Sequence, residues 1–141
     1  MITSKQAYAI LGDPSANEAK FMTLWDVPNN LRIDALPKRI YCNKLLVQPL
    51  WKALLAVSEN GLQGQIKTWD GCFNIRKKRG ASTSSLHSWG LAIDINAAWN
   101  GFGKTPTMSK ELVKCFTDNG FDWGGTWSKK DGMHFQLKAF P

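Results

Sequence analysis

The stretch Ser85–Asn96, SLHSWGLAIDIN, contains the clearest strand of the chain and one of its only two histidines. Leu91–Ile95 is typical of a β-strand, and a period of two places Asp94 on the face opposite the two isoleucines. His87 lies seven residues before Asp94, at the end of a polar segment. The sequence therefore predicts a sheet with one apolar face and a carboxylate on the other face.

Hydrophobic periodicity and turn residues predict further elements on both sides of this stretch. Helices are expected over about 15–25 with Ser15 as N-cap, over 43–60 with Gly61 as the stop, and from Ser109 to Asn119–Gly120. Strands are expected over 65–69, before a turn at Asp70–Gly71, and over 121–123 and 133–137, while residues 76–85 predict a loop. Helices segregated from a small antiparallel sheet predict an α+β fold.

Length and composition favour one domain, spanning residues 1–141. The chain has 43% hydrophobic residues and a formal net charge of +7, so an ordinary core and polyanionic partners are both expected. The apolar segment Ala7–Leu11 stops at Gly12, which is too short for a signal-peptide core, and no run approaches the ~18 apolar residues of a membrane span. We expect a protein made in a bacterial cytoplasm, without a transmembrane segment.

The cysteines are odd in number and widely spaced. Cys42, Cys72 and Cys115 suggest neither a disulfide framework nor a zinc-knuckle spacing. Reduced structural thiols are therefore expected.

Both histidines lie near carboxylates that suit metal-assisted hydrolysis. Zinc hydrolases commonly bind the metal through three nitrogen or oxygen side chains and keep a fourth position for water. His87, Asp94 and His134 satisfy that count, and Asp131, three residues before His134, would be a general base. Spacing alone favours the simpler interpretation, in which each histidine is a buried structural residue.

The residue pattern around the histidines resembles that of a known family. The pattern is Ser85-x-His87-x-x-Gly90-x-Ala92-x-Asp94-Ile95-Asn96, then Trp123-Gly124-Gly125-x-Trp127 and Asp131-Gly132-Met133-His134-Phe135. It is similar to the zinc D-alanyl-D-alanine carboxypeptidases and L-alanyl-D-glutamate endopeptidases, over about residues 71–137. The resemblance implies a compact α+β fold like that of these peptidases and hedgehog proteins, with helices flanking a central antiparallel sheet. It also implies one catalytic Zn²⁺ per chain and peptidoglycan stem peptides as substrate.

The resemblance also assigns roles to single residues. It implies His87, Asp94 and His134 as metal ligands, Asp131 as the catalytic carboxylate, and Arg76, or else Arg79, as the cation that holds the substrate. Gln136 departs from the family, where a glutamate is common, and is expected to donate a hydrogen bond close to the site. An aspartate at 131 rather than a glutamate places the chain nearer the endopeptidase members.

Several functions follow as hypotheses. The first is an L-alanyl-D-glutamate endopeptidase acting as a phage or prophage endolysin, monomeric, and released to the cell wall through a pore. A D-alanyl-D-alanine carboxypeptidase is the alternative. From other classes come a non-catalytic, zinc-containing wall-binding module and a nucleic-acid-binding protein; the scattered basic residues and the lack of a groove-reading motif disfavour the latter. Host range, the cleaved bond and the role of residues 1–60 are left open.

Overall fold

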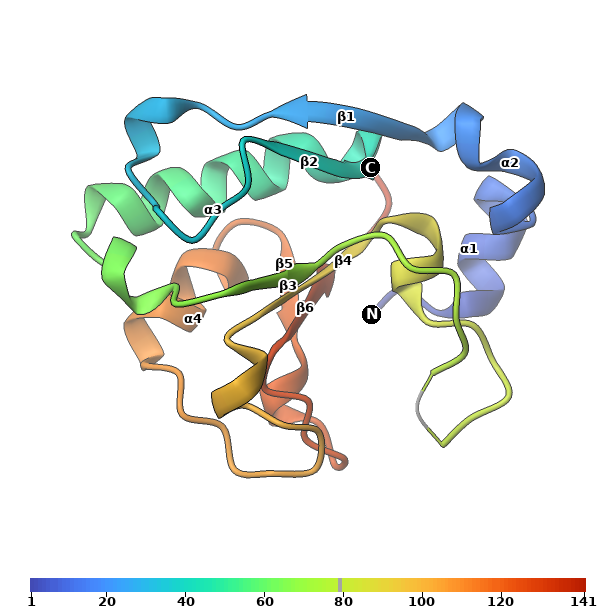
Figure 1. Cartoon of the computed structure of the whole chain (residues 1–141). Helices are drawn as coiled ribbons and strands as arrows, with labels where there is room; N and C mark the ends of the chain where they lie inside the picture. Colours follow the sequence, from blue (N-terminus) through green and yellow to red (C-terminus); the bar gives the residue numbers. More distant parts are fainter. Residues whose placement is uncertain (79) are drawn as a thin grey trace.

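The chain folds around a four-stranded antiparallel sheet in the computed structural model, which describes residues 1–78 and 80–141 (Figure 1). The strands of this sheet follow the order β3 (Trp69–Gly71), β4 (Ala92–Ile95), β6 (His134–Leu137) and β5 (Phe121–Trp123). A separate antiparallel pair joins β1 (Met22–Asp26) to β2 (Arg39–Asn43). The helices are α1 (Ser4–Leu11), α2 (Pro14–Phe21), α3 (Val47–Glu59) and α4 (Lys110–Thr117). The expected α+β class with a central antiparallel sheet is confirmed.

The two faces of the central sheet have different surroundings. Phe135 of β6 is fully buried, and its ring lies 4.5 Å, between centroids, from that of Phe116 on α4. Because side chains alternate along a strand, His134 and Gln136 point to the opposite face. One face of the sheet therefore contributes to the core, and the other carries polar side chains that are nevertheless buried.

The two longer helix predictions are largely correct. A short 3₁₀ turn occupies residues 44–46 at the start of the segment expected to be helical over 43–60, and α3 follows it. Gly61 adopts the left-handed conformation just after α3, at φ 68°. The N-terminus of α4 is capped by Ser109, whose hydroxyl accepts a hydrogen bond from the backbone N–H of Leu112 at 3.1 Å. Buried apolar side chains at helical spacing and a capping serine were sufficient for these elements.

The helix predicted over 15–25 is wrong at both ends. Asp13, not Ser15, caps α2 by accepting a hydrogen bond from the backbone N–H of Ala16 at 3.0 Å. The helix stops at Phe21 because the following five residues pair with β2, so tertiary pairing overrides the local helical pattern.

The strand predicted over 65–69 is displaced, and the turn predicted at Asp70–Gly71 lies inside β3. The backbone N–H groups of residues 67 and 68 donate to Oδ1 of Asn96, at 2.8 and 3.2 Å. This side chain takes the place of a ladder partner, so regular pairing with β4 begins only at β3.

The N-terminal helices pack against the segment that carries His87. Nε1 of Trp89 donates to the carbonyl oxygen of Gly12 at 2.9 Å, and the Tyr8 ring lies edge-on to Trp89 at 4.9 Å between centroids. Ser4 of α1 donates a hydrogen bond to the carbonyl oxygen of Ser84. These contacts bring the start of the chain beside the 3₁₀ turn Leu86–Trp89, which precedes β4.

Gly90, at the end of that turn, is required by a close approach of two backbones. It has φ 64°, and a Cβ there would lie 2.7 Å from the backbone nitrogen of Asn43 and 2.6 Å from Sδ of Met22. Glycine is therefore the residue that fits here without a clash.

Replacing Gly90 by alanine should lower the free energy of unfolding by about 3 kcal/mol, because left-handed strain and a backbone clash add together. Gly61→Ala is the matched control: its φ is also positive, yet nothing lies within 4 Å of its Cβ position. A loss of about 1 kcal/mol is expected there. Urea denaturation measures both values, and equal losses would contradict the steric explanation.

The cysteines behave as structural residues. All three are buried and free, as expected. Burial raises the pKa of the Cys42 thiol to about 12 and also raises the pKa of the Cys72 thiol, so both stay protonated at neutral pH. No helix among the described residues is long and apolar enough to cross a membrane.

Candidate metal centre

Three elements bring His87, Asp94 and His134 together. His87 lies on the 3₁₀ turn Leu86–Trp89, where the Ser85 hydroxyl accepts a hydrogen bond from the His87 backbone N–H at 3.2 Å. Asp94 and His134 are register partners on the neighbouring strands β4 and β6. Directly opposite residues of an antiparallel pair have adjacent side chains, so strand pairing itself places this carboxylate beside this imidazole.

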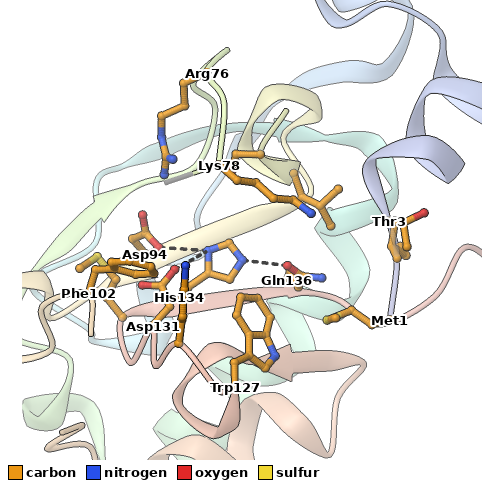
Figure 2. A pocket seen from close by; sticks show the side chains of 15 residues that line it. Met1, Thr3, Arg76, Lys78, Asp94, Phe102, Trp127, Asp131, His134 and Gln136 are labelled. Atoms are coloured by element: carbon orange, nitrogen blue, oxygen red, sulfur yellow. Dashed lines mark hydrogen bonds and ion pairs between the residues drawn. The ribbon is translucent and has the colours of Figure 1, made fainter. Parts of the chain in front are cut away.

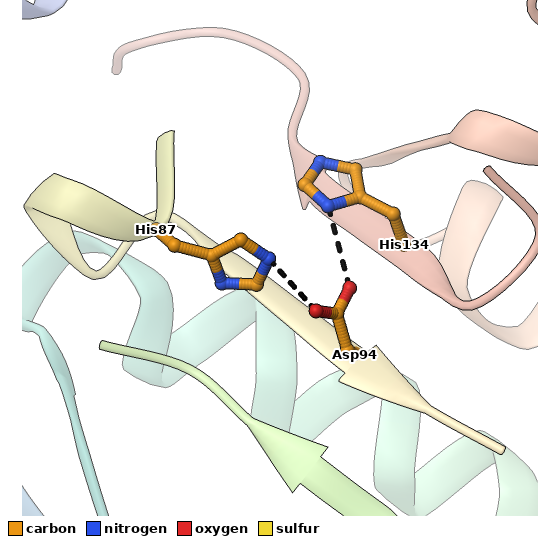
Figure 3. A group of neighbouring side chains, drawn as sticks. All are labelled: His87, Asp94 and His134. Atoms are coloured by element: carbon orange, nitrogen blue, oxygen red, sulfur yellow. Dashed lines mark ion pairs between the residues drawn. The ribbon is translucent and has the colours of Figure 1, made fainter. Parts of the chain in front are cut away.

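One nitrogen of each histidine faces the Asp94 carboxylate (Figure 3). Nε2 of His87 lies 3.1 Å from Oδ2 of Asp94, and Nδ1 of His134 lies 3.4 Å from Oδ1. The three candidate ligand atoms lie within 4.8 Å of one another, and both histidines are almost completely buried. Of the described residues, these three form a group that could hold a metal ion.

In each imidazole, the nitrogen that points away from Asp94 forms a hydrogen bond with an oxygen acceptor. Nδ1 of His87 lies 2.7 Å from the carbonyl oxygen of Cys72, and a carbonyl can only accept, so this nitrogen carries the proton. Nε2 of His134 donates to Oε1 of Gln136 at 2.9 Å. In the neutral rings, the lone pairs of His87 Nε2 and His134 Nδ1 are therefore directed at Asp94.

With both imidazoles neutral, this arrangement favours a cation between the three groups. Nε2 of His87 and Oδ1 of Asp94 are buried without a hydrogen-bond partner within residues 1–78 and 80–141. Two lone pairs and a carboxylate repel one another unless a positive charge lies among them. Two imidazole nitrogens with fixed tautomers and one carboxylate oxygen are a donor set that suits Zn²⁺, with room for a further ligand. The residues present therefore fit a zinc ion.

The pKa shifts of Asp94 and His134 show the same preference for positive charge beside the carboxylate. Burial alone would raise the pKa of Asp94, but His134 and His87 outweigh burial and hold that pKa below its usual range. Burial alone would lower the pKa of His134, but Asp94 outweighs it and the pKa is raised. The pocket thus favours an anion and a cation side by side.

Asp131 lies next to this group without being part of it. Its Oδ2 is 4.0 Å from Nδ1 of His134, and its side chain is 22% exposed. The backbone is held in place: the Asp131 N–H donates to the carbonyl oxygen of Gly124 at 2.9 Å, and a Cβ on Gly124 would lie 2.5 Å from the Asp131 carbonyl oxygen. The structure therefore places the predicted general base beside the predicted ligands.

A cavity of about 270 Å³ opens over these residues (Figure 2). Arg76 lines it, as do Asp94, Asp131 and His134, so the preferred candidate for the substrate-holding cation does face the site. The alternative, Arg79, lies outside the described residues. Trp127 forms one wall, with its ring 5.3 Å from that of His134 between centroids.

Sequence reasoning missed part of this pocket. Met1, Ile2 and Thr3 line it, as does Phe102, and none of them belongs to a recognisable motif. The Cys72 carbonyl, which orients His87, is a backbone group that no residue pattern reveals. The expectation for Gln136 needs one correction: it shares a face with His134 as alternation predicts, but its Oε1 accepts the hydrogen bond instead of donating one.

A comparison with known protein families matches the segment that carries the candidate metal centre. Residues 78–137 match the model of a family described as D-alanyl-D-alanine carboxypeptidase. No curated protein and no solved structure gave a significant match to the chain. The matched range contains His87, Asp94, Asp131 and His134, and it supports, at the level of the family, a zinc-dependent peptidase of peptidoglycan.

Proposed function

We propose that this protein is a zinc peptidase that cleaves peptidoglycan stem peptides between L-alanine and D-glutamate. The observation that carries the proposal is the convergence of two imidazole nitrogens on the Asp94 carboxylate, beside a cavity that Asp94, Asp131 and His134 line. His87, Asp94 and His134 would hold the metal. Bound zinc supplies Lewis acidity, which polarises a carbonyl group and lets water ionise near neutral pH.

The other residues of the site have different roles in this mechanism. Asp131, partly exposed to the cavity, accepts a proton from the attacking water and delivers it to the leaving amine. Arg76 orients the peptide by binding a carboxylate or carbonyl oxygen with its guanidinium group. The Cys72 carbonyl and Gln136 keep the two imidazoles in the tautomers that leave the inward nitrogens free.

Two features support the endopeptidase over the other hypotheses. The carboxylate at position 131 is an aspartate, which resembles the endopeptidase members, and the net charge of +7 suits an anionic cell wall. An endolysin of a phage or prophage, made in the host cytoplasm, monomeric and released through a pore, is the biological setting we propose.

The description of the matched family favours a second candidate, a D-alanyl-D-alanine carboxypeptidase. A digest of purified peptidoglycan by the zinc-loaded protein, with and without chelator, separates the two. Mass spectrometry should find new L-alanine C-termini and D-glutamate N-termini that disappear with chelator. Released D-alanine would instead establish the carboxypeptidase, and no cleavage despite one bound zinc per chain would favour a wall-binding module.

A further inference from the structure

The side of the cavity away from Asp131 contains the amide of Gln136, whose NH₂ group the metal centre does not use. Gln136 is only 4% exposed and lines the cavity. Its Oε1 accepts a hydrogen bond from His134, and its Nε2 donates none to the residues that the structure describes. Figure 2 shows this nitrogen turned away from the imidazole. A glutamine amide can donate two hydrogen bonds, so a donor is left for whatever fills the cavity.

Lys78 lines the same cavity, and in Figure 2 its ammonium group lies on the Gln136 side of the pocket, away from Asp131. Thr3 and Met1 close this end. No ion pair involving Lys78 occurs within the described part of the chain. The end of the cavity beyond the metal centre therefore offers an amide donor and a cation, with no acidic side chain of the described cavity lining beside them in Figure 2.

The charged side chains that line the cavity also favour an anionic ligand. Arg76, Lys78 and Lys129 line it against only two carboxylates, Asp94 and Asp131, of the described residues. Zinc would neutralise Asp94 and leave the cavity strongly cationic. A glutamate at 136 would place a carboxylate at this end of the cavity, whereas glutamine keeps the hydrogen bond to His134 and adds no charge.

We propose that Gln136 Nε2 and the Lys78 ammonium form a subsite for a free carboxylate on the peptide residue next to the cleaved bond. The proposal rests on the proposed function and specifies its substrate: an acidic residue whose carboxyl group is free, rather than amidated. A carboxylate accepts the amide N–H and the ammonium N–H together, and hydrogen bonds to charged groups are the stronger ones. Gln136 thus orients a metal ligand with its oxygen and recognises substrate with its nitrogen.

Binding of product peptides tests the subsite without relying on catalysis. The probes are two peptides that begin with D-glutamate and differ only in whether its α-carboxyl group is free or amidated. Isothermal titration calorimetry of the zinc-loaded protein should show about tenfold tighter binding of the free carboxylate. In Gln136→Glu and in Lys78→Met this preference should fall to about one, with one zinc per chain retained.

Lys77→Met is the matched control, because Lys77 is exposed like its neighbour Lys78 but does not line the cavity. It should keep the tenfold preference. Equal affinity of the wild type for both peptides would overturn the subsite, and so would variants that weaken both peptides equally, since a purely structural role predicts that result. A retained preference without any cleavage of peptidoglycan would instead support the subsite and contradict the proposed function.

Discussion

Asp131→Asn should lower kcat for peptidoglycan cleavage by about 10³-fold while one zinc per chain remains bound. The amide keeps the size of the side chain but cannot take a proton from water. The backbone of Asp131 is held by its N–H bond to Gly124 and by its carbonyl, which accepts from the His134 N–H at 3.1 Å, so the substitution should leave the loop in place. Turnover of labelled peptidoglycan and zinc content by atomic absorption measure the two quantities.

Asp118→Asn provides the control for this prediction. Asp118 is an exposed carboxylate that forms an ion pair with Lys114 at 3.0 Å, and neither residue lines the cavity. Its replacement should leave kcat unchanged. If Asp131→Asn retained more than a tenth of the wild-type rate, another group would have to serve as the base, and the proposed mechanism would be wrong.

His134→Ala should abolish the stabilisation of the protein by zinc. At a free zinc concentration of a thousand times Kd, ligand binding to the native state alone contributes about 4 kcal/mol, which corresponds to a rise in Tm of about 10 °C for a chain of this size. Without His134, Asp94 loses the imidazole opposite it and the metal loses one of its three proposed protein ligands. Thermal unfolding with and without zinc should then give the same Tm.

The Asp131→Asn protein is the natural comparison for this experiment. It should keep the full zinc-dependent rise in Tm, because Asp131 lies beside the proposed ligands and is not one of them. A zinc response that survived in His134→Ala, or one that disappeared in Asp131→Asn, would reassign the ligand set.

Several elements could be predicted from residue patterns because their stability is local or strongly patterned. The apolar alternation of β4, the helical spacing within α3 and the Ser109 cap of α4 each express a short-range preference. By contrast, β1 follows α2 without a break and exists only because β2 pairs with it. Single-sequence patterns contain no information about that pairing, which explains why a helix was predicted there.

In the candidate site, too, some features follow from the sequence and others only from the tertiary structure. The chemical groups of the candidate ligands follow from the residue types, since imidazole and carboxylate are the side-chain groups of His87, His134 and Asp94. Asp131 is also recognisable, three residues before the second histidine. Motif and resemblance together therefore predict these four residues as candidates from the sequence alone.

Only the tertiary structure decided how these groups are arranged. The register of β4 against β6 places Asp94 opposite His134, and the Cys72 carbonyl and Gln136 select the nitrogens that face inward. Packing of α1 against the turn that carries His87 adds the first three residues to the cavity wall. Such relations join residues that are distant in sequence through backbone hydrogen bonds and packing, whereas the chemistry of a side chain is present as soon as the residue is known.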